Sequence, residues 1–459
     1  MERLLVDHAR LVATMDAERR EIADGAIWIE GGLIRWVGPA DELDPSVREL
    51  AGREQGFHRL DASRLVIMPG MVNTHHHLFQ SLTRALPGAQ DRPLFDWLVN
   101  HYPRWSRLTP EMVYVSAQVA LCELVLTGAT TVSDHLYLYA NGARIDDEIR
   151  AAQELGVRFH PCRGSMSIGE SKGGLPPDAT VEDEDALLLD TREAIERWHD
   201  STPGAMCRIA VAPCAPFNVS EDLMRRSAEL ARAYGVLLHT HVAETRDEEE
   251  YTLERVGMRP AAYMASLGWV GPDVWWAHAV HLNSDEIALL AETNTGVAHC
   301  PSSNMRLGSG IAPVRAMLDA GVRVSLAVDG SASNDSSNML AEARQAMLLQ
   351  RVLSGAEALS ARQALEMATL GGAAVLCRDD LGALAPGMCA DLIGYDVEQL
   401  PLAGAQADPL GALLFCIPGH VDLSVINGRV IVEGGQLLTA DVPALVARHN
   451  AQSRLLWSG

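Results

Sequence analysis

The chain has 459 residues, and 37 basic against 60 acidic side chains give it a formal net charge of −23 with neutral histidine. An acidic field of this size repels phosphate groups, so we expect neither nucleic acid nor an anionic membrane surface as a partner, but a small neutral molecule. Hydrophobic residues make up 48% of the sequence, which predicts folded domains with a sizeable core rather than a disordered chain.

The N-terminal segment lacks the features of a secretory signal. Glu2, Arg3, Asp7 and Arg10 interrupt the stretch that would have to be apolar, and no uncharged apolar run reaches the roughly 18 residues of a membrane helix. We therefore expect a cytoplasmic protein. Its eight cysteines are scattered without a C-x-x-C pair, which predicts reduced thiols that lie mostly in the core.

Both ends of the chain carry the pattern of short strands joined by tight turns. Apolar and polar side chains alternate on either side of Gly31-Gly32 near the start, and on either side of Asn427-Gly428 near the end. These dipeptides tolerate the positive φ angles that a two-residue hairpin turn requires. The two ends are therefore predicted to be halves of one β domain.

Between the two ends, short β-branched runs alternate with amphipathic segments, the pattern of parallel strands joined by crossover helices. The runs are residues 130–135, 157–162, 207–214, 236–244, 274–282, 295–303 and 322–331. Polar residues stand where these runs end, as the active-site residues of a (β/α)₈ barrel do. An open doubly wound sheet would normally carry a glycine-rich phosphate loop, and the common ones do not occur here.

We therefore predict an α/β fold in which a (β/α)₈ TIM barrel, residues 68–380, interrupts a small β-sandwich domain. Residues 1–67 and residues 381–459 are the two parts of that domain. Two separate β caps at the chain ends would produce the same sequence pattern, so this alternative stays open.

A histidine cluster ends the first apolar run of the barrel region. His75 and His77 are two residues apart, so their side chains share one face of a strand while His76 points to the other face. Two imidazoles aimed at one point favour a divalent metal ion. Taken alone, the same residues are also typical of a histidine-rich turn.

Two further runs end with groups that can complete a metal site. His239 and His241 again share a face, and their spacing leaves open which of them binds. Glu244 follows on the next loop, where it can carry a proton, and Asp329 ends an apolar run with no basic residue close by. A lone Asp-Gly is usually a turn, but three histidines and one carboxylate at strand ends form a ligand set for Zn²⁺ or Fe²⁺ with one position for water.

Five motifs follow one another along the chain. They are PG-x-V-N-T-H-x-H (69–77), H-x-H-x-x-E (239–244), A-H-x-V-H (277–281), H-C-P-x-S-N (299–304) and V-x-L-x-x-D-G (324–330). In this order they resemble the amidohydrolase superfamily, in the aminohydrolase branch that acts on purines, pyrimidines and triazines. Residues 386–396 are similar to the returning β-sandwich segment of that family, so the resemblance covers essentially the whole chain.

The resemblance implies an assignment for each polar group. One divalent ion, Zn²⁺ in the first place with Fe²⁺ as the alternative, would be held by His75, His77, His241 and Asp329. Glu244 would shuttle protons, and His278 would stabilise the attacking oxygen. Members with two metals carry a lysine or carboxylate at the end of the fourth strand. Residues 210–218 contain neither, so we expect a single metal ion.

The chemistry of deamination needs the same groups. Water that attacks an amino-bearing ring carbon must lose a proton, which Asp329 can accept. The ring nitrogen and then the departing amine must gain one, which a protonated Glu244 can donate, since ammonia leaves far more readily than an amide anion. His278 can donate a hydrogen bond to the developing charge. The three residues are therefore the predicted catalytic groups.

Three residues are candidates for binding the substrate. Gln80 lies three residues beyond His77, and its carboxamide can read the N–H and C=O edge of a lactam ring, although it could instead cap the following helix. Arg163 could bind a second carbonyl or form a structural salt bridge. Trp105 is either a stacking face or part of the core. We expect supporting roles around the site for His281, His299, Asn304 and Asn334.

Residues 75–84 and 163–178 are most similar, within the branch, to enzymes that act on 8-oxoguanine and isocytosine. The reaction implied is hydrolysis of 8-oxoguanine to urate and ammonia, and of isocytosine to uracil. Triazine or hydroxytriazine aminohydrolases and guanine or pterin deaminases are the alternatives among enzymes. A non-catalytic scaffold with this fold is the alternative from another class. The sequence leaves the oligomeric state open, homo-oligomers included.

Overall fold

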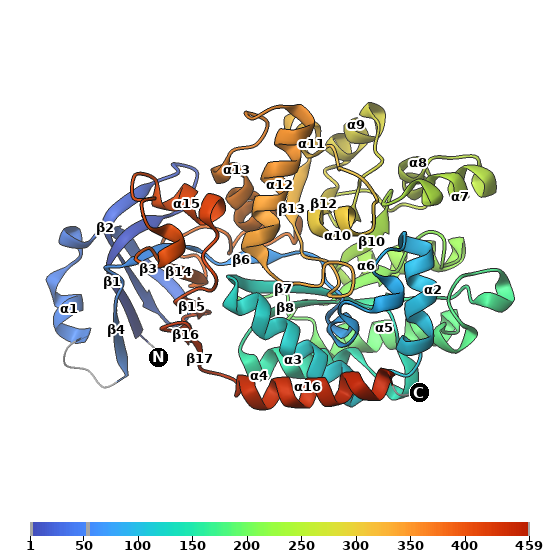
Figure 1. Cartoon of the computed structure of the whole chain (residues 1–459), viewed down its shortest axis with the longest axis horizontal. Helices are drawn as coiled ribbons and strands as arrows, with labels where there is room; N and C mark the ends of the chain where they lie inside the picture. The colour runs from blue at the N-terminus through green and yellow to red at the C-terminus, as the bar shows by residue number, and fades with distance from the viewer. Residues whose placement is uncertain (1–2, 52–55, 458–459) are drawn as a thin grey trace.

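The computed structural model describes residues 3–51 and 56–457, and Figure 1 shows two parts lying side by side. The larger part alternates strands and helices, and the smaller part is mainly β-sheet. The chain begins in the smaller part, passes through the larger part and returns. This architecture confirms the predicted α/β class, with a barrel inserted into a β domain that both chain ends form.

The larger part is a barrel of eight parallel strands in sequential order. They are β6 (Met71–Asn73), β7 (Ala129–Leu136), β8 (Arg158–Ser165), β9 (Ala210–Pro213), β10 (Leu237–Val242), β11 (Val274–His278), β12 (Gly296–His299) and β13 (Arg323–Leu326). The first and last strands meet at Thr74, whose N–H donates to Leu326 O at 3.4 Å and whose hydroxyl lies 2.7 Å from Ser325 Oγ. All seven runs predicted as barrel strands lie in this sheet.

Helices cover the outside of the strands (Figure 1). They are α2 (Leu94–Trp105), α3 (Pro110–Leu126), α4 (Ile145–Leu155), α5 (Glu184–Trp198), α6 (Glu221–Tyr234), α7 (Arg246–Val256), α8 (Pro260–Ser266), α9 (Ser284–Thr293), α10 (Pro301–Arg306), α11 (Val314–Asp319), α12 (Met339–Ser354), α13 (Ala361–Glu366) and α14 (Gly372–Val375). In α6, Ser220 Oγ accepts the Leu223 N–H at 3.0 Å, and Gly235 ends the helix with a φ of 67°. Its buried side chains recur at helical spacing and face β9 and β10.

The smaller part is one continuous sheet of nine strands. They are β1 (Arg3–Ala13), β2 (Glu21–Glu30), β3 (Leu33–Pro39), β4 (Phe57–Asp61), β5 (Leu65–Pro69), β14 (Leu392–Asp396), β15 (Leu423–Ile426), β16 (Arg429–Glu433) and β17 (Gln436–Leu437), and α1 (Pro45–Ala51) lies between β3 and β4. The antiparallel pair of β5 and β14 joins the two chain ends. The alternative of two separate β caps is therefore wrong.

The two predicted hairpin turns are both present and lie against each other. Gly31 and Gly32 have φ angles of 63° and 79°, and Asn427 and Gly428 have φ angles of 50° and 77°. Positive φ at both central residues is the geometry that matches the twist of a hairpin. A Cβ atom on Gly32 would lie 2.7 Å from Asn427 Oδ1, so glycine is required there for packing as well as for conformation.

The last helix, α16 (Val442–Trp457), packs on the barrel rather than on the sheet. It lies along α3, where Arg448 pairs with Glu111, and Ser453 Oγ donates to Leu82 O at 2.7 Å. A short helix before it, α15 (Pro409–Cys416), packs against α12 and α13. Within the predicted segment 381–459, strands therefore contact the sheet while the helices contact the barrel. The domain boundaries themselves stay a prediction.

Two further predictions concern membrane-spanning helices and the redox state of the cysteines. Among the described residues, no helix has both the length and the apolar character to cross a bilayer. All eight cysteines lie in the described ranges as free thiols, and five of them are buried. The prediction of unpaired, mostly buried thiols is confirmed.

Candidate active site

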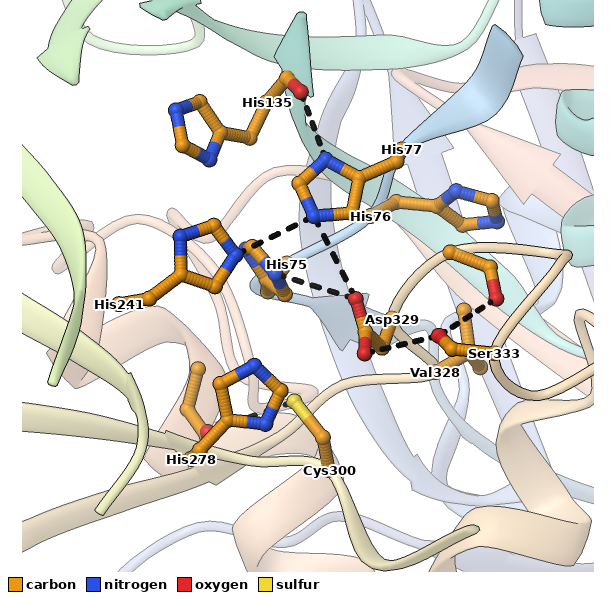
Figure 2. Close-up of polar contacts among 12 residues, drawn as sticks. His75, His76, His77, His135, His241, His278, Cys300, Val328, Asp329 and Ser333 are labelled. Carbon is orange, nitrogen blue, oxygen red and sulfur yellow. Dashed lines mark hydrogen bonds and ion pairs between the residues drawn. The ribbon is translucent and has the colours of Figure 1, made fainter. Parts of the chain in front are cut away.

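The four side chains predicted to hold a metal ion meet where the barrel strands end (Figure 2). His75 Nε2 and His77 Nε2 lie 3.2 and 3.5 Å from Asp329 Oδ1. His77 Nε2 lies 3.2 Å from His241 Nε2. None of the four residues is more than 8% exposed. These residues, which come from β10 and from the loops after β6 and β13, are called the His–Asp cluster below.

Hydrogen bonds at the far side of two imidazole rings decide which nitrogen faces the cluster. His77 Nδ1 lies 2.7 Å from His135 O, and His241 Nδ1 lies 2.6 Å from Cys214 O. A carbonyl oxygen only accepts, so both Nδ1 atoms donate, and both Nε2 atoms keep a lone pair when the rings are neutral. Two lone pairs this close repel unless a cation lies between them. Nitrogen ligands of one tetrahedral zinc ion are about 3.3 Å apart.

His239 orients His75 instead of facing the cluster. Its Nδ1 donates to Trp275 O at 3.0 Å, so its Nε2 is the acceptor for His75 Nδ1 at 2.7 Å. His75 Nε2 is left as a buried lone pair with no hydrogen-bond partner among the described residues. The structure thus answers what the spacing left open, because His241 and not His239 faces the cluster.

The donor atoms of the His–Asp cluster fit a divalent cation. Burial raises the pKa of Asp329, but the surrounding imidazoles outweigh this effect and hold the pKa well below its usual range. Ser333 Oγ donates to Asp329 Oδ2 at 3.0 Å, while Oδ1 faces His75 and His77. Three neutral imidazole nitrogens and one ionised carboxylate oxygen suit Zn²⁺ or Fe²⁺.

Glu244 and His278 lie beside the cluster. Glu244 Oε2 is 3.5 Å from His278 Nε2, and His278 Nδ1 is 2.9 Å from Asn304 Oδ1. Glu244 Oε1 is buried without a hydrogen-bond partner among the described residues. Burial raises the pKa of Glu244 to about 7, so this carboxyl can gain or lose a proton near neutral pH. Burial lowers the pKa of His278, but the carboxylates of Glu244 and Asp329 outweigh it and raise the pKa overall.

A cavity opens beside the His–Asp cluster. His77, His241, Glu244, His278 and Asp329 contribute to its lining. The rest of the wall is largely apolar or aromatic and includes Leu94, Trp97, Tyr102, Tyr137, Phe217 and Leu307. No lysine or arginine is found among the described residues that line it. A cavity with this lining suits a small, flat, uncharged ring.

Gln80 is one of the residues that line this cavity. It belongs to the 3₁₀ turn η2 (Leu78–Thr83), which directly follows His77, and its side chain makes no capping bond to that turn. Its Oε1 accepts the Ala332 N–H at 3.3 Å. A Cβ atom on Gly330 would lie only 1.9 Å from this oxygen, so the glycine makes room for the carboxamide. The alternative role of Gln80 as a helix cap is therefore wrong.

Arg163 does not reach the cavity, so its predicted contact with the substrate is corrected. Its guanidinium is buried beneath the barrel helices, where it donates to Glu182 at 2.7 and 2.9 Å and to Asp190 at 2.9 Å. It also stacks over the ring of Tyr139 at 3.7 Å. Because the guanidinium is engaged by two carboxylates and an aromatic ring, it has no donor left for a ligand. The structural salt bridge is the alternative that the structure supports.

Trp105 is also absent from the cavity wall, and its predicted role as a stacking face is corrected. The side chain is fully buried, and its Nε1 donates to Thr83 Oγ1 at 3.1 Å. It packs edge-on against Phe79 and Trp97. Trp105 therefore supports the wall from behind, because it stands at the last position of α2 while the residues that face the cavity come earlier in the helix.

The four residues expected in supporting roles are His281, His299, Asn304 and Asn334. His281 Nε2 donates to Ser309 O at 2.8 Å, and Asn334 Nδ2 donates to Val328 O at 2.7 Å. Asn304 contacts the catalytic candidate His278, as described above. His299 is fully buried, and neither ring nitrogen has a partner among the described residues.

Several residues of the site were not singled out from the sequence. Tyr137 lines the cavity and stands two residues after His135, so strand alternation could have placed it on the same face. Ser333, which donates a hydrogen bond to Asp329, follows that residue by four positions in the same loop. Tyr102 and Phe217 come from segments that carry no motif, and only the fold brings them to the cavity.

Comparison with known proteins identifies the family. The model of the amidohydrolase family matches residues 66–431. The chain belongs to the amidohydrolase family. It is 48% identical to the 8-oxoguanine deaminase of Pseudomonas aeruginosa over 451 residues, which cover 98% of either chain. It is 40% identical to the hydroxydechloroatrazine ethylaminohydrolase of a Pseudomonas species, over 89% of this chain and 86% of that one.

A solved structure supports the same conclusion. The atrazine chlorohydrolase TrzN from Arthrobacter aurescens TC1, complexed with zinc, matches this amidohydrolase with a TM-score of 0.92 at 33% identity, over 98% of this chain and all of that one. The predicted family, barrel fold and enzyme class are confirmed: this amidohydrolase is a metal-dependent hydrolase that acts on carbon–nitrogen bonds. The alternative of a non-catalytic scaffold is therefore not supported.

Proposed function

We propose that this amidohydrolase hydrolyses 8-oxoguanine to urate and ammonia, with isocytosine as a second substrate that gives uracil. The observation that carries the proposal is a single cavity whose lining includes His77, His241 and Asp329 of the His–Asp cluster together with Glu244 and Gln80. The 48% identity to an 8-oxoguanine deaminase over nearly the full length supports the choice of ring.

We assign His75, His77, His241 and Asp329 as ligands of one zinc ion. The unpartnered Nε2 of His75 and the facing Nε2 atoms of His77 and His241 support this assignment. When bound, such an ion lowers the pKa of water to about 7 and so makes a nucleophile available at neutral pH. Residues 210–218 offer no lysine or carboxylate for a second ion. Iron in place of zinc would be compatible with the same ligands.

Three side chains move the protons of the reaction. Asp329 accepts a proton from the attacking water, because it is ionised and faces the histidines of the cluster. Glu244, whose pKa of about 7 keeps part of the population protonated, donates to the ring nitrogen beside the attacked carbon. The carboxylate left on Glu244 takes up the hydroxyl proton of the tetrahedral adduct and passes it to the amine, which leaves as ammonia while the carbonyl forms. The proton held by Asp329 then returns Glu244 to its protonated form. His278, with a raised pKa, donates to the developing negative charge.

Recognition of the ring rests on shape and on one amide. Gln80 offers both a donor and an acceptor to the lactam edge of the substrate. The apolar and aromatic wall, which includes Trp97, Tyr137 and Phe217, covers the faces of a planar ring. The absence of lysine and arginine from the described lining favours an uncharged substrate.

A substrate panel tests the proposal directly. Purified enzyme with zinc is incubated with 8-oxoguanine, isocytosine, guanine, a pterin and an alkylamino-hydroxytriazine, and released ammonia or amine is measured. The triazine is included because a relative at 40% identity is named for that activity. We expect the highest kcat/KM with 8-oxoguanine and measurable turnover of isocytosine. Turnover of the triazine with none of 8-oxoguanine would overturn the choice of ring.

A further inference from the structure

The turn that presents Glu244 is held by a second buried glutamate. Glu248 lies one turn into α7 and is only 1% exposed. Its Oε1 accepts the N–H of Ala243 at 2.8 Å, and its Oε2 accepts the N–H of Glu244 at 3.0 Å. Ala243 has a φ of 56°, a left-handed conformation that a residue with a side chain adopts only when its surroundings enforce it. The carboxylate supplies that constraint.

Ordinary helix capping does not account for this geometry. A glutamate at the third helical position usually reaches back to the N–H of the N-cap residue. Glu286 does so at the start of α9, where its Oε2 accepts the Asn283 N–H at 2.9 Å. Glu248 holds the same helical position in α7 but reaches past the N-cap, Thr245, to the two residues before it. It therefore fixes the two peptide groups that set the direction of the Glu244 side chain.

The same turn is tied to the loop that follows His278. Ala243 O accepts the N–H groups of both Val280 and His281 at 2.9 Å. His278 itself has a left-handed φ of 74°, and its Nε2 faces Glu244 Oε2 at 3.5 Å. A change in the orientation of residues 243 and 244 would therefore alter the distance between these two groups.

We propose that Glu248 is a positioning residue, whose carboxylate clamps the Ala243 and Glu244 amides so that Glu244 faces His278 and the substrate cavity. The inference rests on the proposed function, because it takes Glu244 as the proton carrier. In Glu248→Gln an amide NH₂ replaces one acceptor oxygen, so one backbone N–H faces another donor and is released from the clamp. A loss of this kind leaves the metal ligands in place.

The test compares Glu248→Gln with Glu286→Gln in the zinc-loaded enzyme. Both changes replace a buried carboxylate at the third position of a helix, but only the first touches the Glu244 turn. We expect Glu248→Gln to speed amide hydrogen exchange at residues 243 and 244 and to lower kcat on the order of 10²-fold. KM and zinc content should stay within about twofold, because the cavity wall and the cluster are unaltered. Glu286→Gln should leave kcat and the exchange at residues 243 and 244 as in the wild type.

A double-mutant cycle separates a positioning role from general damage. If Glu248 acts through Glu244, adding Glu248→Gln to Glu244→Gln should lower kcat no further. Unchanged kcat in Glu248→Gln, an equal further loss in the Glu244→Gln background, or the same loss in Glu286→Gln would each overturn the role of Glu248. If Glu248→Gln does not fold, Glu248→Asp, which keeps both oxygens on a shorter stem, replaces it with the same expectations and a smaller loss.

The outcome for Glu248 is distinguishable from failure of the proposed function. A wild-type enzyme that releases no ammonia or amine from any ring of the substrate panel would overturn the proposed function itself. An active wild type whose Glu248 variant keeps both kcat and amide protection would overturn only the clamp.

Discussion

Buried polar groups occur at both ends of the barrel, but they are satisfied in opposite ways. At the amino-terminal end, Arg158 makes two bonds to Asp391 of the β domain at 2.8 and 2.9 Å and two more to backbone carbonyls. Beside it, Arg378 pairs with Asp380. At the carboxyl end, His75 Nε2 and Glu244 Oε1 are buried and have no hydrogen-bond partner among the described residues.

This difference distinguishes buried polar groups that stabilise the fold from those that bind a ligand. A buried charge that is fully paired holds elements together, and removing one partner leaves the other uncompensated. A buried polar atom without a partner is unfavourable in the isolated fold and is retained where a metal ion or substrate completes it. At the carboxyl end the orphaned His75 and Glu244 atoms therefore point to the site, while at the amino-terminal end the paired Arg158 and Asp391 join the two parts.

Removing a cluster ligand should break the function most completely. His241→Ala deletes one of the imidazoles that face the proposed ion, so we expect the bound zinc and the turnover to fall to background. Chelation of the wild type should do the same, and added zinc should restore it. Elemental analysis and an ammonia assay measure both effects. His449→Asn is the control, since this buried histidine bonds to Ser81 away from the cluster and should keep metal and turnover.

Glu244→Gln should lower kcat by about 10²–10⁴-fold without loss of metal, because the amide cannot donate and regain a proton. The stability of the variant should change little, because the amide keeps the shape of the side chain and Glu244 Oε1 has no hydrogen-bond partner to lose among the described residues. Steady-state kinetics, elemental analysis and thermal unfolding cover the three readouts. Normal turnover in the metal-replete variant would contradict the assignment of Glu244.

Asp391→Ala, at the junction of the two parts, should lower stability and leave catalysis unchanged. The change leaves the fully buried Arg158 without its carboxylate, so we expect the free energy of unfolding to fall by about 3–5 kcal/mol. The kcat of the folded fraction should stay at the wild-type value, because no cluster residue contacts this pair. Denaturant titration and kinetics at low temperature measure the two quantities. A drop in kcat with stability intact would show that the comparison between the two ends is mistaken.

Gln80→Leu should affect substrate choice more than chemistry. Loss of the carboxamide leaves the lactam edge unpaired, which costs about 1–3 kcal/mol and lowers kcat/KM for 8-oxoguanine by about 5- to 150-fold. Zinc content should not change, because Gln80 contacts Ala332 rather than a ligand. Equal kcat/KM in the variant and the wild type would remove Gln80 from substrate recognition.

A third pair of buried ionisable groups consists of two carboxyl groups. The carboxyl groups of Asp134 on β7 and Glu148 on α4 face each other, and two carboxyls can hydrogen-bond only if one is protonated. Burial raises the pKa of Asp134 to about 7, and burial with the neighbouring carboxylate raises that of Glu148 well above its usual range. A folded-state pKa above the unfolded value near 4 means that the folded state holds more protons.

The stability that this proton provides is complete below about pH 4 and is lost as pH rises through about 7. We therefore expect wild-type stability to decline by about 1 kcal/mol per pH unit between about pH 4 and about pH 7. Glu148→Gln should flatten this decline, because its amide donates to Asp134 without a shared proton. Unfolding free energies at about pH 5, 6 and 7 compare the two proteins. Parallel curves would indicate that the pair does not share a proton. This is the smallest of the expected effects.

The sequence was informative where local rules act. Turn dipeptides predicted both hairpins, because positive φ is a property of the residues themselves. The β-branched runs predicted the barrel strands, and polar groups at their ends predicted the cluster, since the strands of a barrel all point the same way. For Arg163 and Trp105 the sequence allowed either contact with the substrate or a structural role. Their packing shows the structural role in both cases.

By itself, the amino-acid sequence determined the order of strands, the turns and the set of imidazoles and carboxylates available for a metal, because these follow from side-chain chemistry and short-range spacing. Only the tertiary structure decided that His239 orients His75 while His241 faces the cluster, and that Glu248 reaches Ala243 and Glu244. Which nitrogen stays free and which peptide is clamped depends on hydrogen bonds set by backbone positions in space, and spacing along the chain does not specify those.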